Sequence, residues 1–318
     1  IASAGSSILD AGLSSAINLP YSCKTGRCGA CKVKILCGQT RVLQLEVGLS
    51  EAQKTEGWVL SCVRAACCDL TLEVEDLGDI VLPLSKTLPC RISQIDRWAP
   101  DVVRVVLRLP PSADFTFMAG QYIDVIGPNS VRRSYSLANA SADGKRLELH
   151  IRAVVDGEMS DYWFSRAQVN DLLWLHGPLG TFFLRPLAGL DLVFLATGTG
   201  IAPVKAMLES LEGIPLAQRP RSVVVFWGGR SAQDLYWDVE SIAAGQRYVP
   251  VLSRPLPSWT GATGYVQDVL LAHLPDLSST VVYACGSNAM IQSAQEALIQ
   301  AGLSSSRFYS DAFVCSSS

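Results

Sequence analysis

Two segments near the middle of the chain alternate apolar and polar residues, as strands do when one face lies in a core. Residues 103–109 alternate valine and leucine with arginine and one further valine, and residues 147–152 alternate leucine and isoleucine with glutamate, histidine and arginine. Turn-forming residues lie between them, Gly-Pro-Asn at 127–129 and Asp-Gly at 143–144. Short strands divided by such turns predict an antiparallel sheet or β-barrel over residues 89–186.

The pattern changes after residue 186. Four short runs are apolar throughout, at residues 192–196, 223–227, 249–252 and 281–284. A helical stretch follows the first run as far as Leu211, and another, with apolar residues at helical spacing from Met290 to Leu298, ends at Gly302. Glycine favours the position just after a helix. Fully buried strands that alternate with helices predict a doubly wound parallel sheet over residues 187–318.

The composition narrows the class of protein. The 318 residues are 49% hydrophobic and 17% charged, which supplies apolar side chains for more than one core and argues against a disordered chain. The net charge of −3 argues against general binding to nucleic acid, which needs a basic surface. No stretch reaches the roughly 20 apolar residues that a membrane helix needs, so we expect no membrane span. Ten cysteines in a chain of this length do not suggest a small secreted disulfide scaffold, and we expect a cytoplasmic protein.

The cysteines carry the first chemical signal. Three of the ten form a C-x4-C-x2-C run, and the four expected ligands are Cys23, Cys28, Cys31 and Cys62. This is the plant-type spacing for a [2Fe–2S] cluster. Three thiolates must converge on one small core, and Gly26 and Gly29 let the loop turn at low steric cost. The alternative is a zinc site, which usually repeats a short cysteine pair twice.

The fourth ligand is open among four cysteines, namely Cys62, Cys37, Cys67 and Cys68. Cys37 follows an expected strand over 32–36 and is predicted to point away from the loop. The pair at 67–68 precedes another strand-like run. Cys62 follows the apolar pair 59–60, which can hold it against the core, and is therefore favoured. Residues 1–82 resemble a plant-type ferredoxin domain of the β-grasp kind, and residues 83–88 are typical of a linker.

Two short motifs lie in the barrel-like region, Gly-Gln-Tyr at 120–122 and Arg133-Ser134-Tyr135-Ser136. Alone, the tyrosine is a strand residue and the arginine a solvated charge. Their order resembles the FAD-binding domain of the ferredoxin–NADP reductase superfamily. The resemblance implies that Tyr135 stacks on the isoalloxazine, that Ser136 bonds near flavin N5, and that Arg133 pairs with the flavin pyrophosphate.

The resemblance extends to two later segments of the same region. The next family elements are His150-Ile151-Arg152 and then Gly157-Glu158-Met159-Ser160. It implies that a helix begins near Met159 and Ser160 and holds the FAD pyrophosphate at its positive end. The Gly-Pro-Leu-Gly run at 177–180 is the expected barrel-closing turn.

The first strand–helix junction of the last region carries Gly198, Thr199 and Gly200, with Pro203 in the first helical turn. This is not the full dinucleotide fingerprint, but glycines at such a junction let a pyrophosphate approach the backbone. The segment resembles the nicotinamide-binding loop of the reductase superfamily.

The next motif contains Gly228 and Arg230 and is followed by Asp234. It resembles the family element that borders the adenosine. Asp234 can accept hydrogen bonds from ribose hydroxyls and repel a 2′-phosphate, which favours NADH over NADPH. Arg230 is evidence for the opposite preference, since it can serve a 2′-phosphate. The alternative for Asp234 is an acid at a helix N-terminus.

Two further segments resemble the family. Cys285-Gly286 followed by Met290 matches its Y-x-C-G-x-x-x-M segment, which implies that Cys285 lies beside the nicotinamide C4. The alternative is a buried structural thiol. Phe313 stands where the family often has an aromatic that covers the flavin, and its alternative is a core residue. The residues expected at the point of hydride transfer are Ser136, Cys285 and Phe313.

The motifs as an ordered set resemble the reductase component of bacterial multicomponent systems, with ferredoxin, FAD and NAD domains on one chain. They most resemble the CDP-6-deoxy-glucoseen reductase type, and reductases of aromatic-ring dioxygenases share nearly all of them. The resemblance implies electron transfer from NADH to FAD, to the [2Fe–2S] cluster and to a protein acceptor, a sugar dehydrase or an oxygenase component. Flavin is needed because NADH gives two electrons and the cluster takes one. A redox-sensing subunit without turnover is the alternative from another class.

Overall fold

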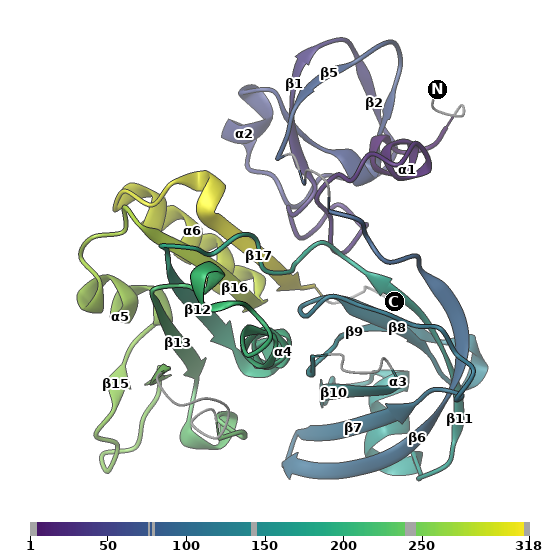
Figure 1. The fold of residues 1–318 in the computed structure, drawn as a ribbon, viewed down its shortest axis with the longest axis vertical. Helices are drawn as coiled ribbons and strands as arrows, with labels where there is room; N and C mark the ends of the chain where they lie inside the picture. Colours follow the sequence, from purple (N-terminus) through teal and green to yellow (C-terminus); the bar gives the residue numbers. More distant parts are fainter. Residues whose placement is uncertain (1–4, 76, 78–79, 141–144, 239–245, 315–318) are drawn as a thin grey trace. The chain divides into compact units, whose positions relative to one another are not determined.

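The computed structural model describes residues 5–75, 77, 80–140, 145–238 and 246–314 (Figure 1). The turn expected at 143–144 lies outside these residues. The chain forms two compact units. The smaller unit contains residues 1–82 with 180–182 and 311–318, and the larger contains the remainder. The domain limits expected from the sequence, at 82, 88 and 186, stay predictions.

The smaller unit is built on a three-stranded antiparallel sheet in the order β3-β1-β5 and a second pair, β2-β4. Its elements are α1 (Ile8–Ser14), β1 (Lys32–Cys37), β2 (Thr40–Val42), α2 (Glu51–Thr55), β3 (Trp58–Leu60), β4 (Arg64–Ala66) and β5 (Thr71–Glu73). The predicted strand at 32–36 is present and runs one residue further. Helix α1 begins after Ser7, whose Oγ accepts from Asp10 N at 3.0 Å. Leu9 of this helix and Leu60 of β3 are fully buried in the core.

The first half of the larger unit is the predicted antiparallel barrel. Its six strands lie in the order β10-β7-β6-β11-β8-β9. They are β6 (Lys86–Ala99), β7 (Val102–Arg108), β8 (Tyr122–Ile126), β9 (Arg132–Ser136), β10 (Arg146–Arg152) and β11 (Leu172–Leu179). A bridge between Leu137 and Leu149 joins the two ends of the sheet. Helix α3 (Glu158–Asp161) continues as a wider π-helical turn over Tyr162–Arg166.

Two local expectations for the barrel were wrong. Residues 177–179 are not a turn but the end of β11, where the pairing with β8 shifts register after His176. Gly177 fits there because a Cβ would lie 2.8 Å from Ile123 Cγ2. The expected solvent face of β7 and β10 was wrong at Val106, Glu148 and His150, which are buried, whereas Arg108 and Arg146 on that face are exposed.

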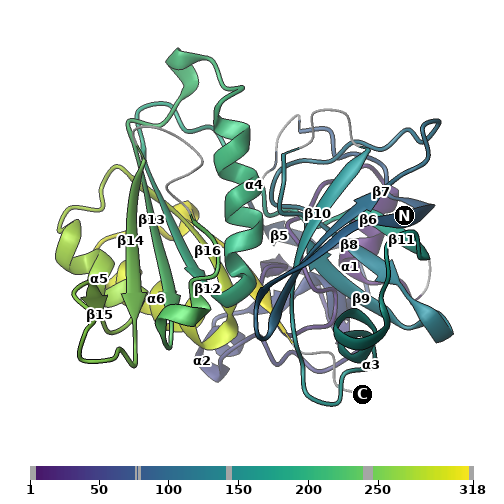
Figure 2. The same ribbon diagram turned by 90° about the horizontal axis from the view of Figure 1, so that it is seen from below.

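The second half of the larger unit is the predicted doubly wound sheet. Its strands lie in the order β15-β14-β13-β12-β16-β17, and β12 to β16 pair in parallel. They are β12 (Asp191–Thr197), β13 (Ser222–Gly229), β14 (Arg247–Leu252), β15 (Ala262–Thr263), β16 (Thr280–Ser287) and β17 (Phe308–Phe313). Helix α4 (Ile201–Leu211) lies on one face, and α5 (Val266–His273) and α6 (Asn288–Gln300) pack together on the other (Figure 2).

Helix α6 ends as its sequence predicts. Gly302 follows the helix with φ +102°, and its N–H donates to Ile299 O at 3.0 Å. The N–H of Leu303 reaches back to Leu298 O at 2.9 Å. These two bonds make a Schellman ending, which needs a residue without a Cβ at Gly302. Among the described residues, no helix is long and apolar enough to cross a bilayer.

Candidate cofactor sites

Four cysteine side chains of the smaller unit meet as two pairs. Cys31 Sγ lies 3.1 Å from Cys62 Sγ, and Cys23 is hydrogen-bonded to Cys28. Cys62 stands on the short 3₁₀ turn after β3, Ser61–Val63, where Ser61 N donates to Cys31 O at 3.0 Å. These are the four cysteines that the sequence singled out. Their rival candidates, Cys37 and the pair at 67–68, are exposed.

Each pair holds one sulfur that favours the thiolate and one that favours the thiol. Hydrogen bonding from the Cys28 thiol lowers the pKa of Cys23 to about 4. The bond from Cys31 lowers the pKa of Cys62, and the same contact together with burial raises the pKa of Cys31. The charge on Cys23 also acts on the pKa of Cys62, so the two pairs are electrostatic neighbours.

Two glycines let the cysteine loop lie against the backbone of residues 45–48. Gly26 has φ +72°, and a Cβ there would lie 2.5 Å from Leu45 O. Gly29 has φ +76°, and its Cβ would lie 3.2 Å from Gly48 O. The loop is tied to this segment by Gly48 N, which donates to Gly26 O at 2.9 Å. Only a residue without a side chain fits Gly26.

This thiol arrangement fits a binuclear iron–sulfur core. In the described parts of the chain, no three His, Cys, Asp or Glu side chains converge as ligands of a single metal ion. Two pairs of sulfurs suit two irons that take two thiolates each, as the four-cysteine ligation of a [2Fe–2S] cluster requires.

The expected flavin residues lie on β9, at the edge of the barrel sheet. Tyr135 OH accepts from Trp163 Nε1 at 2.9 Å, and the two rings meet edge to face with centroids 6.2 Å apart. Burial raises the pKa of Tyr135 to about 12. Ser136 is buried beside it, and Arg133 is half-buried. The Trp163 contact fixes the phenol and leaves a partly exposed ring that can stack on a planar group.

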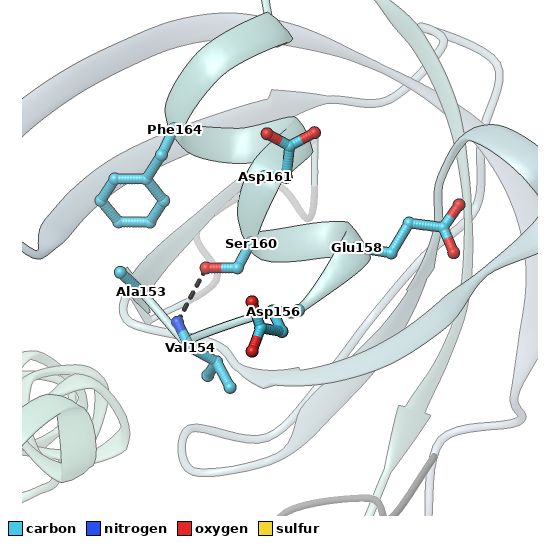
Figure 3. A pocket seen from close by; sticks show the side chains of 8 residues that line it. Ala153, Val154, Asp156, Glu158, Ser160, Asp161 and Phe164 are labelled. Atoms are coloured by element: carbon cyan, nitrogen blue, oxygen red, sulfur yellow. Dashed lines mark hydrogen bonds between the residues drawn. The ribbon is translucent and has the colours of Figure 1, made fainter.

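The helix at 158–166 begins where the sequence predicts, beside a pocket of about 560 Å³ (Figure 3). Ser160 Oγ accepts from Val154 N at 2.8 Å, so the hydroxyl is already engaged. The pocket lining includes three carboxylates, those of Asp156, Glu158 and Asp161. They make this pocket unfavourable for a pyrophosphate.

The other two residues expected at this helix serve the backbone and the core. Met159 is buried, and a Cβ on Gly127 would lie 2.3 Å from its sulfur. Gly157 is the residue at which the helix begins. A Cβ on Gly157 would lie 3.2 Å from both Val154 O and Ser160 Cβ. Both residues therefore have a packing role in the structure.

Two segments that the sequence expected at the nicotinamide meet in space. Residues 198–200 form a 3₁₀ turn between β12 and α4, and a Cβ on Gly200 would lie 2.2 Å from Cys285 O. Gly286 has φ +131°, and its Cβ would lie 2.3 Å from Thr197 Oγ1. The loop after β12 and the end of β16 are therefore in backbone contact. The junction lies at the carboxyl ends of the parallel strands, where dinucleotides bind in such sheets.

Most of the side chains around this junction are buried. Cys285 is fully buried, which agrees with the packing alternative for its thiol. Pro203 lies in the first turn of α4, and Met290 lies buried in the first turn of α6. Ser287 caps α6 by accepting from Met290 N at 3.3 Å. Gly228 is closely packed, since a Cβ would lie 2.8 Å from Val266 Cγ1.

Asp234 is held from two sides. Its Oδ2 accepts from the backbone N–H groups of Arg230 and Ser231 at 2.9 and 3.0 Å, and its Oδ1 accepts from Arg152 Nη2 at 3.0 Å. Burial opposes the charge, yet these bonds keep the pKa of Asp234 below its usual value. Asp234 is the last residue of the 3₁₀ turn Ala232–Asp234, and its carboxylate caps the start of that turn by accepting from Ser231 N. Arg152 was expected at the flavin, but in the structure it lies beside Gly198, in the turn of residues 198–200.

Sequence reasoning missed a buried polar cluster on the outer face of β10. His150 bonds to Tyr236 OH through Nδ1 at 3.1 Å and to Glu148 Oε1 through Nε2 at 3.0 Å. Arg104 donates to Glu148 Oε2 at 2.7 Å, and Lys205 Nζ lies 3.3 Å from Glu148 Oε1. The sequence did contain a signal for this cluster, because Lys205 is a charged residue within the apolar first turns of α4. The cluster joins the two halves of the larger unit, because Lys205 and Tyr236 belong to the second half.

Two other expected residues have less defined surroundings. Ile151 is buried in the barrel core. Phe313, the last residue of β17, is 38% exposed, so it is not a core residue. Its expected role over the flavin stays a prediction.

Sequence models of three families match successive parts of the chain. The 2Fe-2S iron-sulfur cluster binding domain matches residues 1–67, the oxidoreductase FAD-binding domain residues 89–184, and the oxidoreductase NAD-binding domain residues 194–296. These matches agree with the ferredoxin-like sheet, the barrel and the doubly wound sheet, and confirm the predicted fold class.

Similar proteins include two reductases and one solved structure. A CDP-6-deoxy-L-threo-D-glycero-4-hexulose-3-dehydrase reductase from Yersinia pestis is 42% identical, over 97% of this chain and 93% of the relative. The ferredoxin–NAD(P)+ reductase component of naphthalene 1,2-dioxygenase/salicylate 5-hydroxylase systems from Ralstonia is 30% identical, over 98% and 94%. The crystal structure of an Amycolatopsis cytochrome P450 reductase, GcoB, has a TM-score of 0.78 at 30% identity, over 98% and 96%.

Proposed function

The chain belongs to the family of reductases that carry ferredoxin, FAD-binding and NAD-binding domains on one polypeptide, and we propose that its electron acceptor is a CDP-sugar 3-dehydrase. It is an oxidoreductase, and its cofactors are FAD, a [2Fe–2S] cluster and a nicotinamide nucleotide. The bound cofactors supply the redox chemistry, in which flavin takes two electrons as a hydride and the cluster accepts them singly. The protein binds, orients and shields them.

One observation supports the role of the cluster most directly. Two cysteine pairs are electrostatic neighbours, and one of them joins Cys31 to the distant Cys62 at 3.1 Å. We assign Cys23, Cys28, Cys31 and Cys62 as the cluster ligands. Gly26 and Gly29 let the loop pack against the backbone of residues 45–48, and the backbone of Gly26 hydrogen-bonds to Cys62.

The barrel side supplies the proposed flavin contacts. Tyr135, fixed by Trp163, offers its ring for stacking, and Ser136 offers a hydroxyl beside it. Arg133 supplies a guanidinium for the FAD pyrophosphate. Five further residues remain in the proposed flavin site, where they shape it through backbone and packing. They are His150, Ile151, Gly157, Met159 and Ser160.

We propose that the nucleotide binds at residues 198–200, at the carboxyl ends of the parallel strands. Gly198, Thr199 and Gly200 present backbone at the start of α4, where the helix dipole favours a pyrophosphate. Asp234 disfavours a 2′-phosphate by charge, so we propose NADH rather than NADPH. Arg230 is exposed and is the remaining argument for NADPH.

The dehydrase is favoured over an oxygenase by similarity, 42% against 30% for the relatives given above. An oxygenase component remains the second candidate, because the relatives that act with oxygenases also span nearly the whole chain. The cysteine loop also has features of a docking site for a protein. Leu45 is 80% exposed and Val47 is 67% exposed, directly behind Gly26. Exposed apolar side chains in such a place favour a protein partner.

Basic residues near the cluster add to this surface and suit an acidic partner. Lys24 lies 3.7 Å from Asp10 and over the ring of Tyr21, and Lys32 and Lys34 lie over the ring of Trp58. These contacts orient the three lysines, whose alternative role is that of ordinary solvated charges. We also propose a cytoplasmic location, since no disulfide joins any of the nine described cysteines.

The test is turnover of the purified, FAD- and cluster-loaded protein with NADH or NADPH. We expect NADH oxidation to be stimulated by a CDP-sugar 3-dehydrase with its sugar substrate, and cytochrome c to be reduced. Stimulation by a Rieske oxygenase alone would favour the second candidate. No NADH turnover with FAD bound would instead favour the redox-sensing class.

A further inference from the structure

The guanidinium of Arg152 occupies the space beside the nucleotide loop that a side chain at position 198 would fill. Gly198 has φ +55°, and a Cβ built on it would lie 2.9 Å from Arg152 Nη1. Gly198 O accepts from Trp227 Nε1 at 3.0 Å, which holds the loop from the other side. A positive fork therefore lies against the turn at which a pyrophosphate meets the start of α4.

Two carboxylates contact this guanidinium but do not satisfy all of its N–H donors. Nη2 donates to Asp234 Oδ1 at 3.0 Å, and Nε lies 3.2 Å from Asp101 Oδ2. That second contact does not have hydrogen-bond geometry, so the buried Nε–H lacks an acceptor. A buried donor without an acceptor is costly, and an anion with several oxygens can satisfy it.

Asp234 is fixed in a complementary way. Its Oδ2 is held by two backbone N–H groups, which orient the carboxylate independently of Arg152. Its Oδ1 faces only the guanidinium among the hydrogen bonds described for it. If Arg152 turned away, Oδ1 would be an oriented, uncommitted acceptor at the end of β13.

We propose that Arg152 and Asp234 exchange partners when the dinucleotide binds. The guanidinium turns from Asp234 to the pyrophosphate over residues 198–200, and Asp234 Oδ1 accepts a hydroxyl of the adenosine ribose. This assigns Arg152 to the nicotinamide nucleotide rather than to FAD, and it rests on the proposed nucleotide site. Arg152 exchanges a carboxylate for the anionic pyrophosphate, whereas Asp234 exchanges the guanidinium for a neutral hydroxyl donor and keeps its two backbone N–H donors.

The same exchange accounts for selection against a 2′-phosphate. A dinucleotide with a free ribose hydroxyl donates to Asp234, whereas a 2′-phosphate would bring negative charge to an oriented carboxylate. Arg152 cannot neutralise both the pyrophosphate and a 2′-phosphate, because its guanidinium is already bound to the pyrophosphate. The pair therefore sets both affinity and specificity.

The experiment is calorimetric titration of the FAD- and cluster-loaded protein with NAD⁺, NADP⁺ and ADP-ribose. We expect Arg152→Met to weaken ADP-ribose and NAD⁺ binding at least tenfold with unchanged FAD content. We expect Asp234→Asn to lower the preference for NAD⁺ over NADP⁺ at least fivefold. Asp101→Asn is the matched control, because it removes a carboxylate beside Arg152 that the exchange does not use, and it should leave the NAD⁺ to NADP⁺ preference unchanged.

Two outcomes would overturn the exchange. Loss of FAD from Arg152→Met with normal ADP-ribose binding would return the arginine to the flavin. A lower unfolding temperature with unchanged nucleotide binding would make the ion pair a structural clamp. If Arg152→Met does not fold, Arg152→Lys keeps the charge without the fork and should still weaken ADP-ribose binding. A wild-type protein that binds no NAD⁺ would instead refute the proposed nucleotide site.

Discussion

Cys31 Sγ lies 3.1 Å from Cys62 Sγ, although 31 residues separate the two cysteines. Both are in the core, and backbone bonding of Ser61 to Cys31 O keeps their segments in register. The other pair, Cys23 and Cys28, closes within a single loop. Half of the proposed cluster site is thus local in sequence, and the other half depends on the folded sheet.

Replacing Cys62 should remove the cluster without stopping flavin chemistry. We expect Cys62→Ser to lose most of its iron and its visible cluster absorption, while NADH-dependent ferricyanide reduction continues. Cys68→Ser is the control, because Cys68 is exposed. Iron analysis and absorption spectra measure both. Two irons per chain in Cys62→Ser would move the fourth ligand to another cysteine.

Gly26→Ala should damage the cluster loop through a steric clash. The new Cβ would lie 2.5 Å from Leu45 O at φ +72°. We expect a loss of stability at the upper end of about 1–3 kcal/mol, with reduced iron content. Gly189→Ala is matched in φ, +75°, but a Cβ there meets nothing within 4 Å. Equal unfolding temperatures for the two variants would contradict the clash.

Two substitutions of Tyr135 should distinguish the stacking of its ring from the hydrogen bond of its hydroxyl. Tyr135→Phe keeps the ring but leaves Trp163 Nε1 without its acceptor, so we expect retained FAD and a stability loss of about 1–3 kcal/mol. Tyr135→Ala should lower FAD occupancy strongly. Flavin content per chain and chemical denaturation measure the two effects. Full FAD occupancy in Tyr135→Ala would exclude the stacking role.

The cluster of polar side chains on β10 should make the larger unit labile in acid. Burial opposes the charge on Glu148, but bonds from His150 and Arg104 and the charge of Lys205 lower the pKa of Glu148 to about 2. A depressed carboxyl pKa stabilises the fold above its ordinary value of 4.5, and that contribution is lost as the pH falls toward 2.

His150 should act in the same direction at higher pH. Burial lowers the pKa of His150 below 6.5, so its neutral form is favoured in the fold and stability falls as the pH drops through 6.5. Unfolding temperatures between pH 8 and pH 4 test both groups. We expect His150→Gln to flatten the profile between pH 7 and 5. An unchanged slope there would show that His150 is not responsible.

The surface behind the cysteine loop should affect only the protein acceptor. We expect Leu45→Ser with Val47→Ser to raise the KM for the dehydrase severalfold and to leave ferricyanide reduction unchanged. Leu36→Ser, at a 58% exposed site on β1, is the matched control. Arg27→Ala should lower the dehydrase rate at low salt. If cluster reduction by NADH slowed instead, the surface would serve transfer within the chain.

Sequence patterns predicted elements whose environment is set by their own residues. The apolar runs of β12, β13, β14 and β16 gave the parallel sheet, because strands buried on both faces need no polar positions. Gly302 gave the end of α6. The cysteine spacing gave the loop of the cluster site.

Elements covered by distant segments could not be predicted in the same way. Glu148 and His150 indicated a solvent face, but Lys205 and Tyr236 cover them from the other half of the unit. Arg152 was expected at the flavin, and only the folded chain places it beside Gly198. In each case a residue far along the sequence decides the environment.

The most direct test of the account is anaerobic NADH oxidation coupled to a CDP-sugar 3-dehydrase and its substrate. The wild-type protein should oxidise NADH in proportion to the reduced sugar formed. Cys62→Ser should form none, while it still reduces ferricyanide. Equal sugar reduction by the wild-type protein and the cluster-free variant would contradict the account, because electrons would then leave without the four-cysteine site.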